Sequence, residues 1–553
     1  MKTRDRSATK VVRIVPFVSL IVLLVIVIFF HSDPATATIR KIPGLVASDL
    51  FDETDPIDDF VITVKTDNPG TSSSTEFIIP THPDGNYNYN VDCEDDGSIE
   101  MVGVTDSFTC TYTTPLTYTI RIMNNMDSGN GFPRIYFNNE KDADKLLAIK
   151  QWGTGQWTSM EKAFYGCSYL SGQAKDTPDL SNVTDMSYMF ANANSFNQDI
   201  GNWDTSHVKK MRSLFMWANS FNKDIGNWNT SNVTEMGSMF FYASAFDQDI
   251  GTWNVSSLTY ARDMFTGVEL STANYDALLI GWGSQTLQNG VTFHGGNSKF
   301  CRGEGARDGM IDTYSWSITD GERDPACIVG LNATNDSPTL LGETTTMTAT
   351  IASGSGVSYD WDFGDSYTDT GAVVSHPYNT AGVYGAVVTA TNTLNIVTDV
   401  SYVTIYEDLT LLPGEDTTTS DEVLTLEASL ETSGAITLTY TPQISSTHDA
   451  GTFTFAGAYF NLDAIDELGN PITDLTYPIT LTLSYDDDSL AAEIAEEELV
   501  LYRYDTDLMD WVELTGVVDT NANTVTVVLD HLSEFTLAVP EREIKIYLPL
   551  ILR

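Results

Sequence analysis

Large apolar residues recur along the middle of the chain at a constant interval of 25 residues. An earlier, degenerate copy begins at residue 160, 26 residues before its successor. Units this short cannot bury their own apolar face and must stack on their neighbours. We expect the following internal ladders: Met186, Met211 and Met236; Phe196, Phe221 and Phe246; Ile200, Ile225 and Ile250; Trp203, Trp228 and Trp253.

Within one repeat, the apolar spacing changes from helical to extended. Met186, Phe190 and Ala193 follow the i, i+4, i+7 pattern of one helix face. Thr184 with Asp185 offers an N-cap followed by an acid at the positive end of a helix. The segment "QDIGNWDTS" then breaks the helix and supplies a brief extended stretch. The pattern predicts one strand and one helix per repeat, as in leucine-rich-repeat architecture.

The segment "SNVTDMSYMFANANSFNQDIGNWDT" (181–205) resembles, nearly letter for letter, the repeat of BspA-type leucine-rich-repeat-like bacterial surface proteins. The resemblance spans about 130–300 and implies a capped repeat domain over 131–326. Caps are required because the end repeats would otherwise expose the apolar ladders to water. The resemblance implies an adhesin-like binding function at the cell surface.

Polar residues stand beside the repeated isoleucine, and stacking would arrange them in rows on one surface. Many identical weak contacts in a row suit an extended, repetitive or flat ligand. The alternative is that the rows only keep the surface soluble and cap turns. The candidate binding residues are Gln198, Asp199, Lys223, Asp224, Gln248 and Asp249.

Segments rich in alternating apolar residues follow the repeats. "VSYDWDFGDS" and "VSHPYNTAGVYGAVVTATN" resemble the PKD domain, an immunoglobulin-like β-sandwich, here over 327–407. The alternation in "GVYGAVVTATN" fits a strand with one buried face. Further strand-like runs, broken by turn residues at short intervals, predict a C-terminal β-sandwich over 408–540.

The PKD pattern returns near the N-terminus. "YNYNVDCEDDG" and "FTCTYTTPLTYTIRI" align with it, which predicts a PKD-like β-sandwich over 58–130. In this alignment Cys93 stands in the place of Trp361, and Cys110 stands in the place of His376. If these two places touch in the sandwich, the cysteines can form a disulfide.

The five cysteines divide into two pairs and a single residue. Cys93 would pair with Cys110, and closing that loop would contribute about 3 kcal/mol. Cys301 and Cys327 would close a second loop across the C-terminal cap of the repeats, which leaves Cys167 unpaired and buried. Two disulfides suit an exported protein.

Both ends of the chain carry apolar segments. A basic start, an apolar run over 14–30 and small residues at 35–37 predict a secretory signal peptide over 1–37. A retained membrane anchor is the alternative, because the apolar run has the lowest length that spans a bilayer. An acidic linker (38–57) follows, and the apolar tail 541–553 is either a sorting or anchoring signal or a last strand. We therefore expect a secreted or cell-surface protein.

The charge balance narrows the range of partners. The chain has 76 acidic and 28 basic residues, a formal net charge of −48, which repels nucleic acid and anionic membrane surfaces. Membrane contact is expected only through the signal peptide or an anchor. With 42% hydrophobic and 11% aromatic residues the chain is globular, and 553 residues imply several domains.

Catalytic and metal-binding motifs are scarce. The chain has no HExxH, GxSxG, GxxxxGK[ST] or CxxC motif and no histidines in metal-ligand spacing, so we expect no enzyme. Asp92, Glu94 and Asp96 around Gly97 resemble the start of a calcium loop. The twelve-residue spacing and the final glutamate are missing, so an acidic β-turn is the alternative. No other cofactor is expected.

Together these patterns predict a multidomain, mostly β protein. An LRR-like α/β solenoid of about 25-residue repeats would be flanked by immunoglobulin-like, PKD-type β-sandwiches and a C-terminal β-sandwich. The first functional hypothesis is adhesin-like binding of an extracellular protein, matrix or glycan ligand through the repeats. The second is a structural cell-envelope or stalk protein. The third is a glycan-binding accessory to polysaccharide breakdown.

Overall fold

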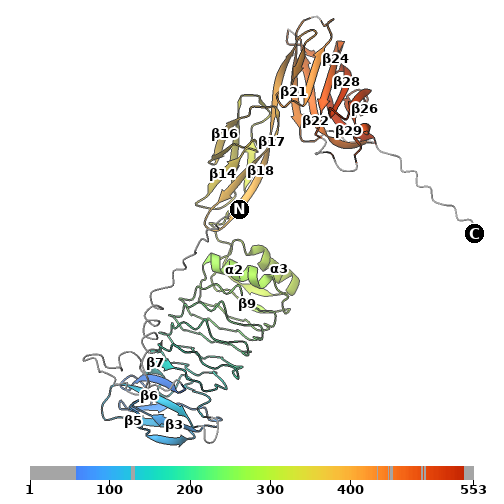
Figure 1. Ribbon diagram of the computed structural model, residues 1–553. Coiled ribbons are helices and arrows are strands. Elements are labelled where there is room, and N and C mark those ends of the chain that lie inside the picture. Colours follow the sequence, from blue (N-terminus) through green and yellow to red (C-terminus); the bar gives the residue numbers. More distant parts are fainter. Residues whose placement is uncertain are drawn as a thin grey trace, which may run out of the picture. The chain divides into compact units, whose positions relative to one another are not determined.

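The computed structural model describes residues 58–125, 131–432, 434–445, 448, 453–466, 468–486, 490 and 494–540 (Figure 1). The predicted signal peptide (1–37), the acidic linker (38–57) and the apolar tail (541–553) lie outside these residues. In the part of the chain that is described, no helix has the length and apolar character needed to cross a membrane.

A six-stranded sheet in the order β4-β3-β6-β1-β7-β8 begins the described chain, and a two-stranded sheet pairs β2 with β5. Burial alternates along β2 and along the second half of β1, because successive side chains point to opposite faces. The Cys93–Cys110 disulfide joins the two sheets. The elements are β1 (Phe60–Lys65), β2 (Glu76–Ile79), β3 (Tyr89–Asp92), β4 (Met101–Val104), β5 (Phe108–Thr111), β6 (Thr117–Asn124), the 3₁₀ turn η2 (Ala143–Lys145), β7 (Leu146–Gln151) and β8 (Ser171–Gly172).

Equivalent tyrosines show how this sandwich corresponds to the PKD segment. The Tyr112 hydroxyl donates a hydrogen bond to the Cys93 carbonyl (2.8 Å), and the Tyr378 hydroxyl donates to the Phe363 carbonyl (3.1 Å). Cys93 therefore occupies the place of Phe363. The predicted alignment of Cys93 with Trp361 is wrong by two residues.

The error follows from the alternation of a strand. Asp360 and Asp362 lie two residues apart in β14, so their side chains share one face, and an alignment that matches acids does not separate them. In the PKD segment the rings of Phe363 and His376 stack with centroids 4.3 Å apart. The Cys93–Cys110 disulfide stands in the place of that ring stack.

The repeats contain neither the predicted helix nor the predicted strand. Between β8 and the helix that begins at Thr272, the backbone forms turns and isolated parallel bridges (Figure 1). The N–H of Met186 donates to Lys210 O in the next repeat (2.9 Å), whereas the N–H of Met189 closes a local turn on Met186 O (3.2 Å). The predicted LRR-like α/β solenoid is therefore wrong.

Backbone conformation explains why no helix forms. Tyr188 and Asn192 both have a positive φ, 59° and 56°, which interrupts a right-handed helix after a few residues. Every second N–H group donates to a carbonyl of the next repeat instead of its own. Tyr188 N donates to Arg212 O (2.9 Å), and Asn192 N donates to Met216 O (2.7 Å). Hydrogen bonds between repeats thus replace the i to i−4 bonds that a helix requires.

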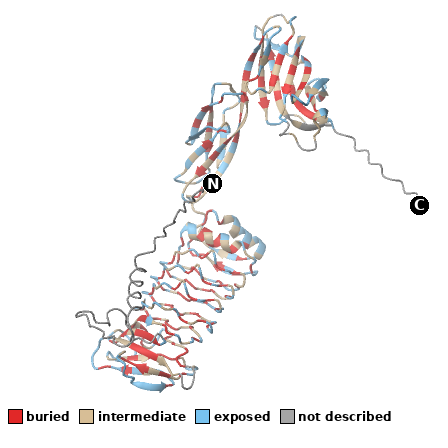
Figure 2. Ribbon diagram, viewed as in Figure 1, coloured by how far each residue is buried: buried red, intermediate tan, exposed pale blue. Residues whose placement is uncertain are grey.

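The predicted apolar ladders lie in the core, as expected. The rings of Phe190, Phe215 and Phe240 stack in sequence with centroids 5.9 and 5.7 Å apart. Trp228 and Trp253 stack at 6.3 Å, and each indole N–H donates to the isoleucine carbonyl of the preceding repeat (2.9 Å). These ladders continue the core of the N-terminal sheets as one cluster of buried residues (Figure 2).

Two helices and a small parallel sheet cap the last repeat. The indole N–H of Trp282 donates to Ile250 O (3.1 Å), which extends the tryptophan ladder into the cap. Asp276, 1% exposed, accepts hydrogen bonds from the N–H groups of residues 301–303. The cap elements are α2 (Thr272–Gly283), β9 (Thr292–His294), α3 (Glu304–Tyr314) and β10 (Ser317–Thr319).

The segment after the cap forms an immunoglobulin-like β fold of two sheets around its own core, which includes Trp361 and Tyr378. One sheet has the order β11-β13-β16, and the other contains β15-β14-β17-β18. The strands are β11 (Asn332–Asn335), β12 (Thr339–Leu340), β13 (Thr344–Thr350), β14 (Ser358–Asp362), β15 (Thr368–Thr370), β16 (Val373–Pro377), β17 (Gly382–Thr391) and β18 (Ile396–Leu411).

β18 continues into the last β region, where it pairs with β21. A five-stranded sheet, β19-β20-β24-β28-β27, and the continuation β21-β22-β29-β25-β26 enclose a leucine-rich core. The elements are β19 (Asp416–Thr418), β20 (Leu424–Ala428), β21 (Ile436–Gln443), β22 (Phe453–Ile465), β23 (Pro471–Ile472), β24 (Asp474–Ser484), the 3₁₀ turn η4 (Glu496–Glu498), β25 (Val500–Asp505), β26 (Asp510–Glu513), β27 (Gly516–Asp519), β28 (Thr524–His531) and β29 (Glu534–Pro540).

Candidate binding surface on the repeats

The three predicted aspartates occupy the same tight turn in successive repeats. Each carboxylate accepts a hydrogen bond from the glycine N–H two residues later, at 3.1 Å for Asp199, 2.9 Å for Asp224 and 2.8 Å for Asp249. These are Asx turns, in which a short acidic side chain replaces a backbone acceptor. The three side chains remain exposed, so the turns hold a row of carboxylates at the surface.

Close backbone contact brings these turns side by side. A Cβ on Gly201 would come within 2.7 Å of the Asp224 carbonyl oxygen, and one on Gly226 within 2.9 Å of the Asp249 carbonyl oxygen. Glycine is therefore required at both positions for the repeats to approach. The structure brings the aspartates into neighbouring repeats, while ligand binding by them stays a prediction.

The remaining predicted residues are half-buried and differ in their contacts. The amide of Gln198 donates to the Ala174 carbonyl (2.8 Å), and the amide of Gln248 donates to Asn222 Oδ1 (2.7 Å). Lys223 stands between them in the row and supplies a positive charge among the exposed acids. The glutamines thus help to hold adjacent repeats together, and their binding role also stays a prediction.

The acidic loop after β3 is organised by its own backbone. Both carboxylate oxygens of Asp92 accept hydrogen bonds from the N–H groups of residues 94–97, with the shortest at 2.7 Å. The side chains of Glu94 and Asp96 are not gathered around a common point with Asp92: among the described residues, no group of three acidic, histidine or cysteine side chains could hold a metal ion. Asp92 thus organises an acidic turn, and calcium binding by this loop stays a prediction.

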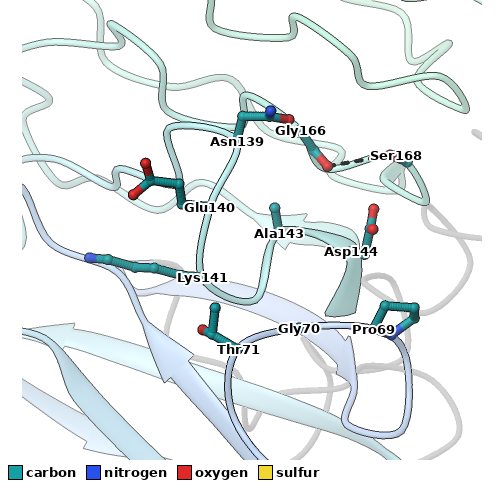
Figure 3. A pocket seen from close by; sticks show the side chains of 10 residues that line it. All are labelled: Pro69, Gly70, Thr71, Asn139, Glu140, Lys141, Ala143, Asp144, Gly166 and Ser168. Atoms are coloured by element: carbon teal, nitrogen blue, oxygen red, sulfur yellow. Dashed lines mark hydrogen bonds between the residues drawn. The ribbon is translucent and has the colours of Figure 1, made fainter.

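A pocket of about 500 Å³ lies where the first sandwich meets the first repeat (Figure 3). Beside it, the buried Lys145 ammonium donates to four oxygens of residues 72–76, and burial lowers the pKa of this lysine. These contacts fix the loop in place and leave the lysine fully engaged. The lining residues are Pro69, Gly70, Thr71, Asn139, Glu140, Lys141, Ala143, Asp144, Gly166 and Ser168.

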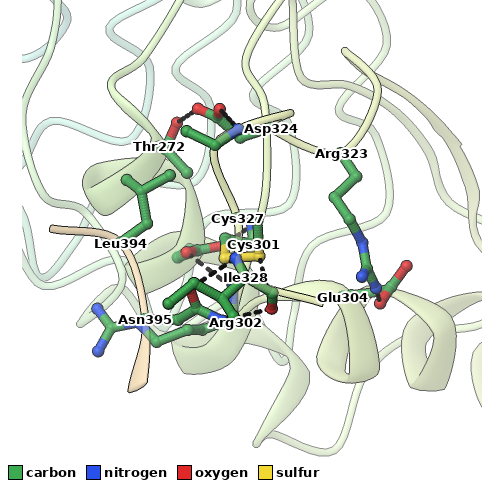
Figure 4. Close-up of a disulfide and its surroundings, with 12 residues drawn as sticks. Thr272, Cys301, Arg302, Glu304, Arg323, Asp324, Cys327, Ile328, Leu394 and Asn395 are labelled. Atoms are coloured by element: carbon green, nitrogen blue, oxygen red, sulfur yellow. Dashed lines mark hydrogen bonds and ion pairs between the residues drawn. A yellow bond between two sulfur atoms is a disulfide. The ribbon is translucent and has the colours of Figure 1, made fainter. Parts of the chain in front are cut away.

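Both predicted disulfides are present, and Cys167 is free and buried. The Cys301–Cys327 bond lies beside Ile328, whose N–H donates to Asn395 Oδ1 (3.0 Å) (Figure 4). Arg323 pairs with Glu304 in the same region. Disulfides are typical of proteins from oxidising, extracellular compartments.

An exposed pair of aromatic residues was not among the sequence predictions. Trp217 and Tyr242 are each 40% exposed, and their rings stack at 4.4 Å with an interplanar angle of 7°. They occupy equivalent positions in successive repeats, where Asn192 and Gly267 stand in the flanking repeats. Bulky aromatics at a position that otherwise holds asparagine or glycine are the signal that could have revealed them.

Comparison with known proteins gives two family matches. Residues 137–278 match a family described as a Mycoplasma protein of unknown function, DUF285, and residues 330–405 match the PKD domain. The first match does not show the BspA-type leucine-rich-repeat family that the repeats resemble. The PKD domain is compatible with a surface binding protein.

No curated protein matches the chain. One solved structure has a title on the promiscuous specificity of carbohydrate-binding modules from the β-sandwich superfamily. It is 12% identical to this chain, with a TM-score of 0.15, and the match covers 39% of this chain and 92% of that chain. A calcium-binding mutant of Bacteroides uniformis beta-glucuronidase 2 is 6% identical, with a TM-score of 0.12, and the match covers 87% of this chain and 80% of that one. Likenesses this weak carry no argument about function.

Proposed function

We propose that the chain is a non-catalytic, adhesin-like binding protein of the cell surface, which contacts a macromolecular ligand through its repeats. One observation carries this proposal: equivalent exposed side chains stand side by side in successive repeats. The Asp199, Asp224 and Asp249 turns have the same hydrogen bond and pack against one another. A ligand with repeated groups would contact several of them at once, and such contacts add through effective concentration.

The resemblance of the repeats to BspA-type surface proteins supports the same proposal, as do the two disulfides and the PKD domain. A rigid support is also present, because hydrogen bonds and ring stacks between repeats fix the spacing of the row. Preorganised groups lose little conformational entropy when a ligand binds.

The test is an array of extracellular-matrix proteins and glycans probed with the purified protein. Asp224→Asn removes a charge from the row but keeps an oxygen that accepts the Gly226 N–H, so the turn is preserved. We expect a ligand on the array, and we expect the triple change of Asp199, Asp224 and Asp249 to asparagine to weaken its binding. Asp67→Asn, an exposed aspartate of the N-terminal sandwich that is not part of the row, is the control. Absence of any ligand, or a triple variant that binds like the original, would refute the proposal.

A further inference from the structure

The Trp217–Tyr242 pair is exposed, unlike the rest of the aromatic residues in the repeat ladders. Phe190, Phe215 and Phe240 are fully buried, whereas Trp217 and Tyr242 are 40% exposed. Exposed aromatic rings forgo the stabilisation that burial of their surface provides. The exposed part of each ring therefore adds nothing to the stability of the fold.

The backbone at these two residues also opposes aromatic side chains. Trp217 and Tyr242 have φ of 60° and 55°, in the left-handed region that bulky residues rarely adopt. The flanking repeats place Asn192 and Gly267 at this position, the residue types that adopt it most readily. The repeat fold imposes this conformation at the position in every repeat, so Trp217 and Tyr242 are kept there at a cost in backbone strain.

The stack covers both faces of the Tyr242 ring and one face of the Trp217 indole. A Cβ on Gly267 would lie 2.7 Å from Cδ1 of Tyr242, so one face of the tyrosine ring lies against the glycine backbone. The other face is covered by Trp217 at 4.4 Å. The Phe241 ring meets Trp217 edge-on, with centroids 6.2 Å apart. Because the repeats stack in order, the second face of the Trp217 indole lies on the side of the preceding repeat, which has the smaller Asn192 at the equivalent position.

Polar amides and hydroxyls lie near Trp217 on the side of the preceding repeat. Two residues beyond Asn192 and Trp217 lie the exposed amides of Asn194 and Asn219, which bond to each other at 3.4 Å. Exposed serines follow both of them. Amides and hydroxyls beside a flat ring are complementary to a sugar, which offers hydroxyl groups at its rim and C–H bonds on its face.

We propose that the free face of Trp217 binds one sugar ring of a neutral glycan, a proposal that rests on and deepens the function proposed above. The C–H face of the sugar would meet the electron-rich face of the indole, in the slot that a third stacked aromatic would fill. Asn194 and Asn219 would exchange hydrogen bonds with the ring hydroxyls. The formal net charge of −48 disfavours an anionic glycan.

Two other ligand classes fit the geometry less well. A stable protein interface buries on the order of 800 Å² per side around a desolvated centre, whereas exposed asparagines and serines stand beside this aromatic pair. A methylated ammonium ligand is held by several ring faces at once, whereas here the rings cover one another and leave one face. The flat, one-sided platform favours the sugar.

The test uses the purified protein with a panel of neutral hexasaccharides (gluco-, xylo-, manno- and N-acetylglucosamine-based), heparin and a trimethyllysine peptide. Affinity is measured by calorimetry, and the indole environment by fluorescence. Trp217→Asn installs the residue found in the neighbouring repeat, so it relieves the backbone and should keep the melting temperature at or above that of the original. Trp217→Phe keeps a smaller ring.

We expect at least one neutral hexasaccharide to bind, about tenfold more weakly in Trp217→Asn and less than that in Trp217→Phe. No binding by any neutral glycan, equal binding by Trp217→Asn, or Trp217-dependent binding of heparin or the peptide instead would each overturn the inference. If the protein still binds a matrix protein through the aspartate row, the proposed function stands while this inference fails. If no array ligand binds at all, both fail.

Discussion

At the scale of single residues, Asp59, just before β1, is a carboxyl group whose burial disfavours its ionised form. It is 8% exposed, and its Oδ2 lies 3.4 Å from Arg121 Nη1. Burial, with smaller contributions from Asp58 and Asp95, raises the pKa of Asp59 from 3.8 to about 6. The folded state therefore holds this proton more tightly than the unfolded chain does between those two pH values.

The stability that protonated Asp59 supplies is complete below a pH of about 4 and is lost as the pH rises through about 6. We expect the melting temperature of the unit formed by the N-terminal sandwich and the repeats to fall over this range, and Asp59→Asn to flatten that fall. Asp67→Asn, at an exposed partner of Lys65 (3.5 Å), serves as the control and should keep the original slope. An Asp59→Asn protein with the same slope as the original would contradict the assignment.

Residue-scale prediction from the sequence succeeded where a periodic pattern carries the information. The methionine, phenylalanine, isoleucine and tryptophan ladders could be identified because burial recurs with the repeat. The role of Asp199 could not be identified from the sequence. A carboxylate that caps a turn and a carboxylate that binds a ligand are both exposed, so the pattern does not separate the two roles. Trp217 was missed because it breaks the pattern instead of repeating it.

At the scale of elements, the cap of the repeats depends on a buried carboxylate in α2. Asp276 accepts the N–H groups of Cys301 (2.8 Å), Arg302 (3.0 Å) and Gly303 (2.8 Å). Asp276→Ala would leave three N–H groups without an acceptor, at a cost of about 3 kcal/mol or more in unfolding free energy. Urea unfolding measures the loss, and hydrogen exchange at residues 301–303 locates it.

Asp312→Ala, at an exposed position of α3, is the matched control for the Asp276 variant and should change the unfolding free energy by less than about 0.5 kcal/mol. If exchange at residues 301–303 were unchanged in Asp276→Ala, the carboxylate would not be what holds this loop.

The disulfides stabilise two different elements and can be removed separately. Cys301 and Cys327 are separated by 26 residues and Cys93 and Cys110 by 17, so chain entropy predicts contributions of about 3.5 and about 3 kcal/mol. We expect the serine double variant of each pair to lower the unfolding free energy by amounts of this order. Calorimetry of both variants measures the two effects, and a melting profile unaffected by either change would refute the prediction.

Element types in the repeats could not be derived from apolar spacing. The i, i+4, i+7 pattern correctly predicts that Met186, Phe190 and Ala193 are buried. Consecutive turns produce the same spacing of buried residues as a helix, so the pattern does not separate the two. The deciding factor is the hydrogen bond from Met186 N to Lys210 O, which exists only after the repeats have stacked. Tertiary contacts of this kind override local helix signals such as an N-cap.

At the scale of the whole molecule, the structure contains separate buried cores. One continuous cluster runs from Phe60 to Trp316, and others surround Trp361 and the leucines of the last sheets. The sequence anticipated the mostly β character through its alternating runs and turn residues. It did not show that the first sandwich and the repeats share a core, because the residues at that junction have no period.

This shared core predicts how the molecule unfolds. Phe215 is fully buried and stacks on Phe190, Phe221 and Phe240, with the shortest centroid distance, 3.9 Å, to Phe221. Phe215→Ala should cost about 3–5 kcal/mol in unfolding free energy. Because the cluster continues into β1 and β6, hydrogen exchange in those strands should accelerate together with exchange in the repeats.

The control is Val388→Ala in the core of the PKD segment, which is also fully buried but belongs to another cluster. It should speed exchange in β14 and β17 and leave β1 and β6 unchanged, whereas Phe215→Ala should do the reverse. Cooperative units follow contiguous buried contacts, so the two sets of amides should separate cleanly. If Phe215→Ala affected only the repeats and spared β1 and β6, the first sandwich would be an independent folding unit despite the buried contacts that join it to them.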